Sequence, residues 1–284
     1  MRVSGAIGAA AAAAVFVAVL VFGPDAGKVT GVAVEAPPPP APTVTTTTRP
    51  VARAVLKTAE NPLLGNGIGL REITCELPKF GRAAEQLRAY YKAMITCMDD
   101  AWRPALEQAN LPFGSPELNI EDKPTTGCGP APSDNEATAF YCGADRTIYV
   151  PRATVLDAVE SHRAGHLNLL GHEYGHHVQL LSGIALANGS AVHKAGEDTP
   201  AGLELIRRQE LQANCFSGLF IAAASGRGTV TKQLADAAVR SFNDSVADDT
   251  HGKLPNQVRW GTDGFRKRTT SACNTYNAPS AQVA

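Results

Sequence analysis

Large apolar residues recur at helical spacing between positions 83 and 109 of the chain. They return to one face every three or four positions, as in a helix that buries one of its sides. The members of this stripe are Leu87, Tyr90, Tyr91, Met94, Ile95 and Met98. The pattern therefore predicts a core helix over 83–109.

Two short apolar runs follow a loop that is rich in Pro, Gly and Thr. Residues 139–141 and 147–150 contain aromatic and β-branched side chains, and they flank Gly143-Ala144-Asp145. Such residues on both sides of a turn are typical of a β-hairpin. We therefore expect a hairpin over 139–150.

Helical patterning dominates the rest of the chain, and Asn, Gly and Pro interrupt it. The expected breaks are Asn188-Gly189, Gly226 and Pro255. The expected helical stretches are 154–186, which can hold two helices, 200–225, 230–246 and 256–273. One short hairpin among many helices predicts a mainly helical α+β domain with a small sheet.

The first 23 residues have a different pattern. Arg2 precedes an uncharged stretch rich in Ala and Val over 3–22, which Gly23-Pro24 closes. Roughly 20 apolar residues span a bilayer, whereas a cleavable signal has a shorter apolar core. We interpret 1–23 as a signal anchor, with a cleaved export signal as the alternative. A soluble helix is disfavoured because the segment lacks a polar face.

Residues 24–60 are rich in Pro and Thr and hold few large apolar side chains. Such a stretch cannot bury enough surface to offset its chain entropy, and its prolines favour extended conformations. The sequence thus predicts a membrane segment over 1–23, a disordered linker over 24–60 and one globular domain over 61–284. The domain is expected on the extracytoplasmic side of a membrane.

Charge narrows the range of partners. The chain has 284 residues and a formal net charge of −1, and its basic residues form no long run. Neither a nucleic acid nor an anionic membrane surface is therefore expected as the main partner.

Cysteine usage agrees with export. All six cysteines follow the apolar segment, and none forms the closely spaced pair of a structural zinc site. Disulfides are therefore favoured, although six cysteines allow about 15 pairings that the sequence does not separate. Our working hypothesis joins nearest neighbours: Cys75 with Cys97, Cys128 with Cys142, and Cys215 with Cys273.

The candidate chemistry lies in His172-Glu173-Tyr174-Gly175-His176. On a helix, His172 and His176 lie one turn apart on one face, so both imidazoles can reach one metal ion. Glu173 lies about 100° around the helix, where it can act on a metal-bound water. Two hydrogen-bonded core histidines are the alternative, and the full motif favours the metal.

A catalytic zinc ion usually takes a third protein ligand and leaves one position to water. Glu210 and Asn214 lie four residues apart on an expected helix, next to the apolar run 216–224. Glu210 is our candidate for the third ligand, although a helical Glu is more often a solvated charge. Asn214 is a candidate to orient a ligating histidine.

The chain resembles the bacterial neutral zinc metallopeptidases, a zincin family. The resemblance rests on the segment 172–179, on similar segments from 123 to 149, on 210–215, and on 251–260, and it spans roughly 61–275. It implies a zincin-like domain, a Zn²⁺ cofactor, peptide or protein substrates and a zinc ligand at Glu210. The family generally has Asp where this chain has Asn214, which implies a weaker zinc site.

The expected reaction is peptide hydrolysis with Glu173 as the general base. His251 is our candidate donor to the oxyanion, ahead of Tyr174 and Arg259. By analogy with zincins, the expected strand over 147–150 pairs with an extended substrate. Two alternatives remain open: a catalytically silent, zinc-stabilised surface protein, suggested by Asn214, and a metal-dependent hydrolase of non-peptide amides.

Overall fold

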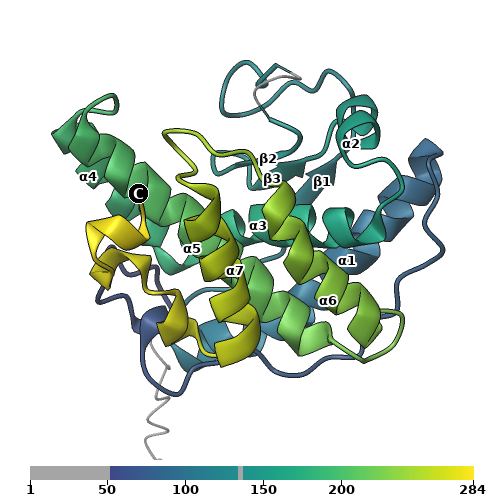
Figure 1. Ribbon diagram of the computed structural model, residues 1–284, viewed down its shortest axis with the longest axis horizontal. Coiled ribbons are helices and arrows are strands. Elements are labelled where there is room, and N and C mark those ends of the chain that lie inside the picture. Colours follow the sequence, from purple (N-terminus) through teal and green to yellow (C-terminus); the bar gives the residue numbers. More distant parts are fainter. Residues whose placement is uncertain (1–51, 134–136) are drawn as a thin grey trace, which may run out of the picture. The chain divides into compact units, whose positions relative to one another are not determined.

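The computed structural model describes residues 52–133 and 137–284 (Figure 1). The expected membrane segment and residues 24–51 of the expected linker lie outside these residues. Among those described, no helix combines the length and apolarity that crossing a bilayer requires. The α-helices are α1 Ala84–Gln108, α2 Arg152–Ala158, α3 Arg163–Ser182, α4 Ile184–Ala195, α5 Pro200–Ala224, α6 Lys232–Arg240 and α7 Leu254–Lys267.

The apolar stripe predicted over 83–109 forms α1, as expected. Its large side chains, including Tyr90, Met94 and Trp102, are fully or almost fully buried in the hydrophobic core. The helix packs against α3 and α5, and α5 in turn packs along α7 (Figure 1). Helix α3 therefore lies inside the domain, with neighbours on several sides.

The predicted stretch 154–186 is divided differently from the expectation. Helix α3 ends at Gly183, which adopts a left-handed conformation with φ of 89°, and α4 begins at once. The break expected at Asn188-Gly189 is wrong, because both residues lie inside α4. The Asn188 side chain donates to Gln209 Oε1 at 2.9 Å, so it serves a contact between helices rather than a turn.

Two helices end earlier than predicted. Helix α6 gives way to a 3₁₀ turn over Ser241–Asp244, and α7 ends where Arg268 takes a left-handed conformation. A second 3₁₀ turn over Thr270–Cys273 follows α7. Thr199 and Thr231 cap α5 and α6 with side-chain oxygens, which fixes where these two helices start.

The expected hairpin exists as β2, Phe140–Cys142, and β3, Thr147–Tyr149. A third strand that the sequence did not indicate, β1, Glu117–Asn119, pairs in parallel with β3. The described sheet has the order β1-β3-β2, so β3 is central and β2 lies at an edge. The expectation that 147–150 pairs with substrate is therefore wrong, since both sides of β3 are already paired.

Helices α3 and α5 approach each other closely because small residues lie between them. A Cβ atom added at Gly175 would lie 3.0 Å from the backbone oxygen of Ala213. Helix α7 approaches α5 in the same way, since a Cβ at Gly264 would lie 2.0 Å from the carbonyl oxygen of Cys215. Larger side chains at Gly175 or Gly264 would force these helices apart.

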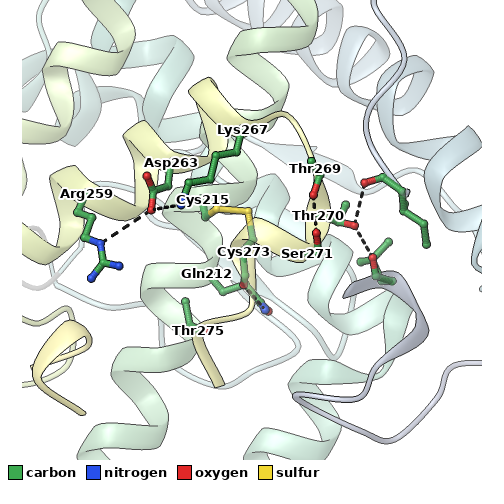
Figure 2. Close-up of a disulfide and its surroundings, with 12 residues drawn as sticks. Gln212, Cys215, Arg259, Asp263, Lys267, Thr269, Thr270, Ser271, Cys273 and Thr275 are labelled. Atoms are coloured by element: carbon green, nitrogen blue, oxygen red, sulfur yellow. Dashed lines mark hydrogen bonds and ion pairs between the residues drawn. A yellow bond between two sulfur atoms is a disulfide. The ribbon is translucent and has the colours of Figure 1, made fainter. Parts of the chain in front are cut away.

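Three disulfides join the six cysteines, and no cysteine of the described chain is free. The nearest-neighbour pairing is confirmed: Cys75–Cys97, Cys128–Cys142 and Cys215–Cys273. Figure 2 shows the last of these, which ties α5 to the segment after α7. Disulfides persist in oxidising compartments, so they indicate an extracytoplasmic domain.

The described residues 52–60, which were expected to belong to the linker, contact the domain. The Val55 N–H donates to the backbone oxygen of Ser182 at 3.0 Å, and Asn61 Nδ2 donates to the same oxygen at 3.0 Å. Asn61 also donates to the backbone oxygen of Val55 at 2.9 Å. The segment 52–60 is thus fastened to the end of α3.

Candidate metal centre

Three side chains from two helices converge in the domain. His172 and His176 lie one turn apart on α3, and Glu210 projects from α5. The two Nε2 atoms are 3.1 Å apart, and each lies 3.2 Å from Glu210 Oε2. The side chains of His172 and Glu210 are 15% and 16% exposed, so the cluster is sheltered but reachable from one side.

The spacing of these three atoms fits a tetrahedral zinc ion. Ligand bonds of 2.0–2.1 Å from His nitrogen and carboxylate oxygen give a tetrahedron with edges of about 3.3 Å. The observed separations of 3.1 and 3.2 Å are close to that edge. The three residues could therefore hold Zn²⁺ and leave its fourth position to the open side.

Hydrogen bonds fix which ring nitrogen of His172 faces the cluster. His172 Nδ1 lies 2.8 Å from Asn214 Oδ1, one turn beyond Glu210 on α5. An amide oxygen only accepts, so Nδ1 carries the hydrogen and Nε2 keeps its lone pair. Asn214 thus orients His172 as the sequence suggested, without the charge of an Asp.

His176 is oriented by a residue that sequence reasoning missed. Its Nδ1 lies 2.9 Å from Gln179 Oε1. The Gln179 amide donates to the Gln209 carbonyl at 2.8 Å and to Gln212 Oε1 at 3.1 Å, so its oxygen must be the atom that faces His176. The only signal in the sequence was a Gln three positions after the second His.

The hydrogen-bonded side chains of Gln179 and Gln212, called the amide chain below, end at the disulfide. Gln212 Nε2 donates to the backbone oxygen of Cys273 at 3.0 Å, beside the Cys215–Cys273 bond (Figure 2). Both Gln179 and Gln212 are fully buried. The orientation of His176 therefore depends on contacts that reach the segment after α7.

Within the cluster, a positive charge on His176 and a negative charge on Glu210 stabilise each other. Burial works against the charged forms, but the His176 ring holds the pKa of Glu210 well below its ordinary value. Burial likewise opposes protonation of His176, and Glu210 overrides it and raises the pKa of that ring to about 9. Binding of a cation would therefore displace a proton from His176.

Glu173 lies beside the cluster on α3 and is 5% exposed. Burial raises the pKa of its carboxyl group, and the charges of His172 and His176 counteract that rise. A buried carboxyl group with a raised pKa beside a candidate metal site is suited to accept and return a proton.

A cleft of about 350 Å³ opens above the cluster. Residues of α3, α4 and α5, of the edge strand β2 and of the loop before α7 line this cleft. Its lining includes Phe140, Tyr141, Gly143, His172, Glu173, His176, Leu180, Ala185, Glu210 and His251. The chain therefore brings the three candidate ligands, Glu173 and His251 to one cavity.

His251 comes from the loop before α7. Its Nε2 lies 3.7 Å from Glu210 Oε2, and its side chain is 42% exposed. The two weaker oxyanion candidates are positioned elsewhere and are not among the described lining residues. Tyr174 is buried and donates to Asp99 at 2.7 Å, and Arg259 pairs with Asp263 at 3.9 Å (Figure 2).

His177, next to the second motif histidine, points away from the cluster. Its Nε2 lies 2.7 Å from the backbone oxygen of Gly114, and its Nδ1 lies 2.8 Å from the Tyr141 hydroxyl. Burial lowers the pKa of this ring to about 4. His177 is therefore a neutral core residue that holds α3 against β2.

Comparisons with known proteins find uncharacterized bacterial relatives. The uncharacterized protein Rv2575 of Mycobacterium tuberculosis is 28% identical over 211 residues, which cover 64% of this chain and 68% of the relative. The uncharacterized protein YpfJ of Escherichia coli is 27% identical over 211 residues, which cover 68% of this chain and 72% of the relative. No solved structure matches the chain.

A family model described as "Putative neutral zinc metallopeptidase" matches residues 77–276. This match spans more than half of the chain, and it contains the candidate ligands, Glu173, His251 and all but one of the cysteines. The chain therefore belongs to this family of zinc metallopeptidases, for which peptides are the implied substrates.

Proposed function

We propose that this protein is a zinc-dependent metallopeptidase in which His172, His176 and Glu210 bind the metal. The observation that carries the proposal is the convergence of two Nε2 atoms and one carboxylate oxygen at 3.1–3.2 Å. These separations match the edge of the tetrahedron that zinc forms with nitrogen and oxygen ligands. The Nδ1 atom of each ring is hydrogen-bonded to an amide oxygen, of Asn214 or Gln179, which fixes the orientation of the ring.

Glu173 is the proposed general base. When bound, zinc supplies a Lewis acid that lowers the pKa of its water to about 7. Glu173 takes the proton of the attacking water and then gives it to the leaving amine. Its burial supports this role, because the resulting raised pKa lets the carboxyl group carry the proton between the two steps.

His251 is the proposed donor to the oxyanion that develops on the substrate carbonyl. Its ring lines the cleft with Nε2 on the side of Glu210. A donor in a partly closed cavity stabilises developing charge more than the same donor in water.

The proposed substrate is an extended peptide that lies along β2. This strand is at the edge of the described sheet, and residues on it and next to it line the cleft. The free side of an edge strand offers unpaired N–H and C=O groups that a peptide backbone can pair with. The apolar stretch 3–22 supports anchoring of the protein to a membrane.

The first test is the metal content of the purified full-length protein by elemental mass spectrometry. We expect one zinc per wild-type chain, and little or none in His172→Ala and Glu210→Ala. His193→Ala, which removes an exposed histidine from α4, is the matched control and should retain the metal. A correctly folded wild-type chain that takes up no zinc would rule out the proposal.

The second test is cleavage of a peptide library. Glu173→Gln should retain zinc and lose activity by at least about a hundredfold, because it removes the general base. Glu85→Gln, an exposed change of the same kind on α1, should behave as wild type.

A silent zinc-binding protein is the second candidate function, and the one observation that favours it is Asn214. This candidate predicts full zinc occupancy in the wild type and no peptide cleavage by either wild type or Glu173→Gln. The contact of 2.8 Å between Asn214 Oδ1 and His172 Nδ1 favours the active enzyme, because the ring is still held in position.

A further inference from the structure

The loop that carries His251 is built around one carboxylate. Asp248 Oδ1 accepts the backbone N–H groups of Thr250 at 2.8 Å and of His251 at 2.6 Å, together with the Thr250 hydroxyl at 2.8 Å. The backbone oxygen of Asp248 accepts the N–H of Gly252 at 2.9 Å. Asp248 therefore closes the turn in which His251 lies.

The same carboxylate also holds the His251 ring. His251 Nδ1 lies 3.0 Å from Oδ2 and 3.1 Å from Oδ1 of Asp248. A carboxylate only accepts hydrogen bonds, so Nδ1 carries a hydrogen and Nε2 is the nitrogen turned toward Glu210. Nε2 donates to an oxyanion when the ring carries a hydrogen on that nitrogen as well, and the negative charge of Asp248 behind the ring stabilises this form. The Thr250 hydroxyl lies 3.1 Å from Nδ1, so Asp248 and Thr250 together orient a side chain that is 42% exposed.

Contacts from outside the loop keep it in place. Gln257, which is 1% exposed, donates to the backbone oxygens of Val246 at 2.7 Å and Gly252 at 3.0 Å. Arg207 donates to the backbone oxygen of Asp249 at 2.7 Å. The loop is therefore pinned near both ends to α7 and in the middle to α5.

We propose that Asp248 is a positioning residue that aims Nε2 of His251 at the reacting carbonyl group. The inference rests on the proposed peptidase function, because it assigns His251 to the oxyanion. Asp248 does not line the cleft and acts only through His251.

Asp248→Asn changes the contact with the His251 ring and is expected to keep the hydrogen bonds that close the turn. The turn needs an acceptor at the position of Oδ1, so the new amide places its NH₂ group at the position of Oδ2, facing His251 Nδ1. This donor excludes a hydrogen from Nδ1, so the ring can no longer carry a hydrogen on both nitrogens, and the variant lacks the negative charge that supports such a positively charged donor. The backbone of the loop is expected to stay as it is.

The experiment compares Asp248→Asn, His251→Ala and the double variant in kinetics on one peptide substrate. We expect kcat to fall by about 10- to 100-fold in Asp248→Asn with KM changed by less than about threefold, and by about 10²- to 10³-fold in His251→Ala. The double variant should be no slower than His251→Ala, because Asp248 acts through that ring. Zinc content should stay at the wild-type level in all three.

Asp249→Asn is the matched control, since it removes the same charge one residue away and its exposed side chain has no hydrogen bond or ion pair with a described residue. It should leave kcat unchanged. If the effects of Asp248→Asn and His251→Ala multiply in the double variant, or if Asp249→Asn slows the reaction equally, the positioning role is overturned.

Nitrogen-15 NMR of the histidine rings gives a readout that does not depend on turnover. The His251 Nδ1 signal, assigned by its loss in His251→Ala, should be that of a protonated nitrogen in wild type and of an unprotonated one in Asp248→Asn. An unprotonated Nδ1 in wild type would overturn the assignment. If wild type shows the expected signal but cleaves no peptide, the proposed function is wrong and the catalytic role of Asp248 falls with it.

Discussion

Asn214 contacts His172, a proposed zinc ligand, and should therefore affect the zinc affinity. Its amide accepts the Nδ1 hydrogen of His172 at 2.8 Å, whereas a carboxylate there would also raise the basicity of the ring. We predict that Asn214→Asp binds zinc about tenfold more tightly than wild type and that Asn214→Ala binds it 10- to 100-fold more weakly. Competition with a chelator of known affinity measures both changes.

The exposed Asn243→Asp provides the control for the added charge and should leave zinc affinity unchanged. An Asn214→Asp variant with the same affinity as wild type would contradict the importance of the contact.

His166 makes the stability of the fold sensitive to acid. Its Nδ1 lies 2.6 Å from the Tyr91 hydroxyl and its Nε2 lies 3.1 Å from the backbone oxygen of Glu160, an arrangement that fits a neutral ring. Burial lowers the pKa of His166 below its ordinary value of 6.5. As the pH falls below about 6.5, the unfolded chain takes up a proton that the folded chain does not, so the free energy of unfolding decreases until the folded pKa is reached.

We therefore predict that His166→Gln, whose amide does not titrate, is less stable than wild type at pH 7.5 but loses less stability between pH 6.5 and pH 5. Urea unfolding across this range measures the difference in slope. Parallel curves for the two proteins would show that His166 does not carry the acid sensitivity.

Sequence reasoning reached the site residues that a helical period brings together. His172 and His176 share a face because they lie four residues apart, and Glu210 stood out on the next long helix. Gln179 was missed because the contacts that fix its amide come from α5, which a period does not encode. Asp248 was missed because it lies in an irregular loop, where no period marks the side chains that meet. The partners of Gln179, for example, lie 30 and 33 residues away.

At the scale of elements, the junction of α3 and α4 depends on Gly183. A Cβ atom there would lie within 2.6–2.9 Å of three backbone atoms of Val55, and φ is 89°. We predict that Gly183→Ala destabilises the domain by about 1–3 kcal/mol because it strains the left-handed turn and displaces the segment at Val55. Thermal or urea unfolding measures the loss.

Gly189→Ala is the matched change inside α4, where an added Cβ meets no atom within 4 Å. It should stabilise the protein by about 0.5–1 kcal/mol, because alanine favours the helix over glycine. Equal effects at the two glycines would contradict the assigned end of α3.

These two glycines also explain an error in the predicted elements. Gly189 was interpreted as a helix break because Asn-Gly is a strong turn signal, yet the helix continues through it. The strand β1 was missed for another reason: it has only three residues, and its partner β3 follows 30 positions later. Short elements that are stabilised by tertiary pairing leave little trace in the local pattern.

At the scale of the whole molecule, the Cys215–Cys273 disulfide closes a loop of 58 residues, whereas Cys128–Cys142 closes one of 14. Loop-closure entropy assigns roughly 4 kcal/mol to the longer crosslink and roughly 3 kcal/mol to the shorter one. We predict that the double variant Cys215→Ala/Cys273→Ala loses 2–5 kcal/mol of stability and also binds zinc more weakly. Its zinc affinity should fall because Gln212 is bonded to the backbone of Cys273.

Cys128→Ala/Cys142→Ala is the control, since that disulfide lies in the β2 region and has no contact with the amide chain. It should lower stability with little change in zinc affinity. Equal zinc affinities in the two double variants would show that the amide chain does not transmit the effect of the crosslink.

The proposed ligand set is divided between α3 and α5, so it forms only when these two helices are packed together. A cation held there would bind the folded chain and not the unfolded one, which makes the folded population a function of free metal concentration. At a free zinc concentration one hundred times the dissociation constant, this mass action would add about 2.7 kcal/mol to the free energy of unfolding. Zinc supply outside the cytoplasm would then govern how long the protein survives there as well as how fast it works.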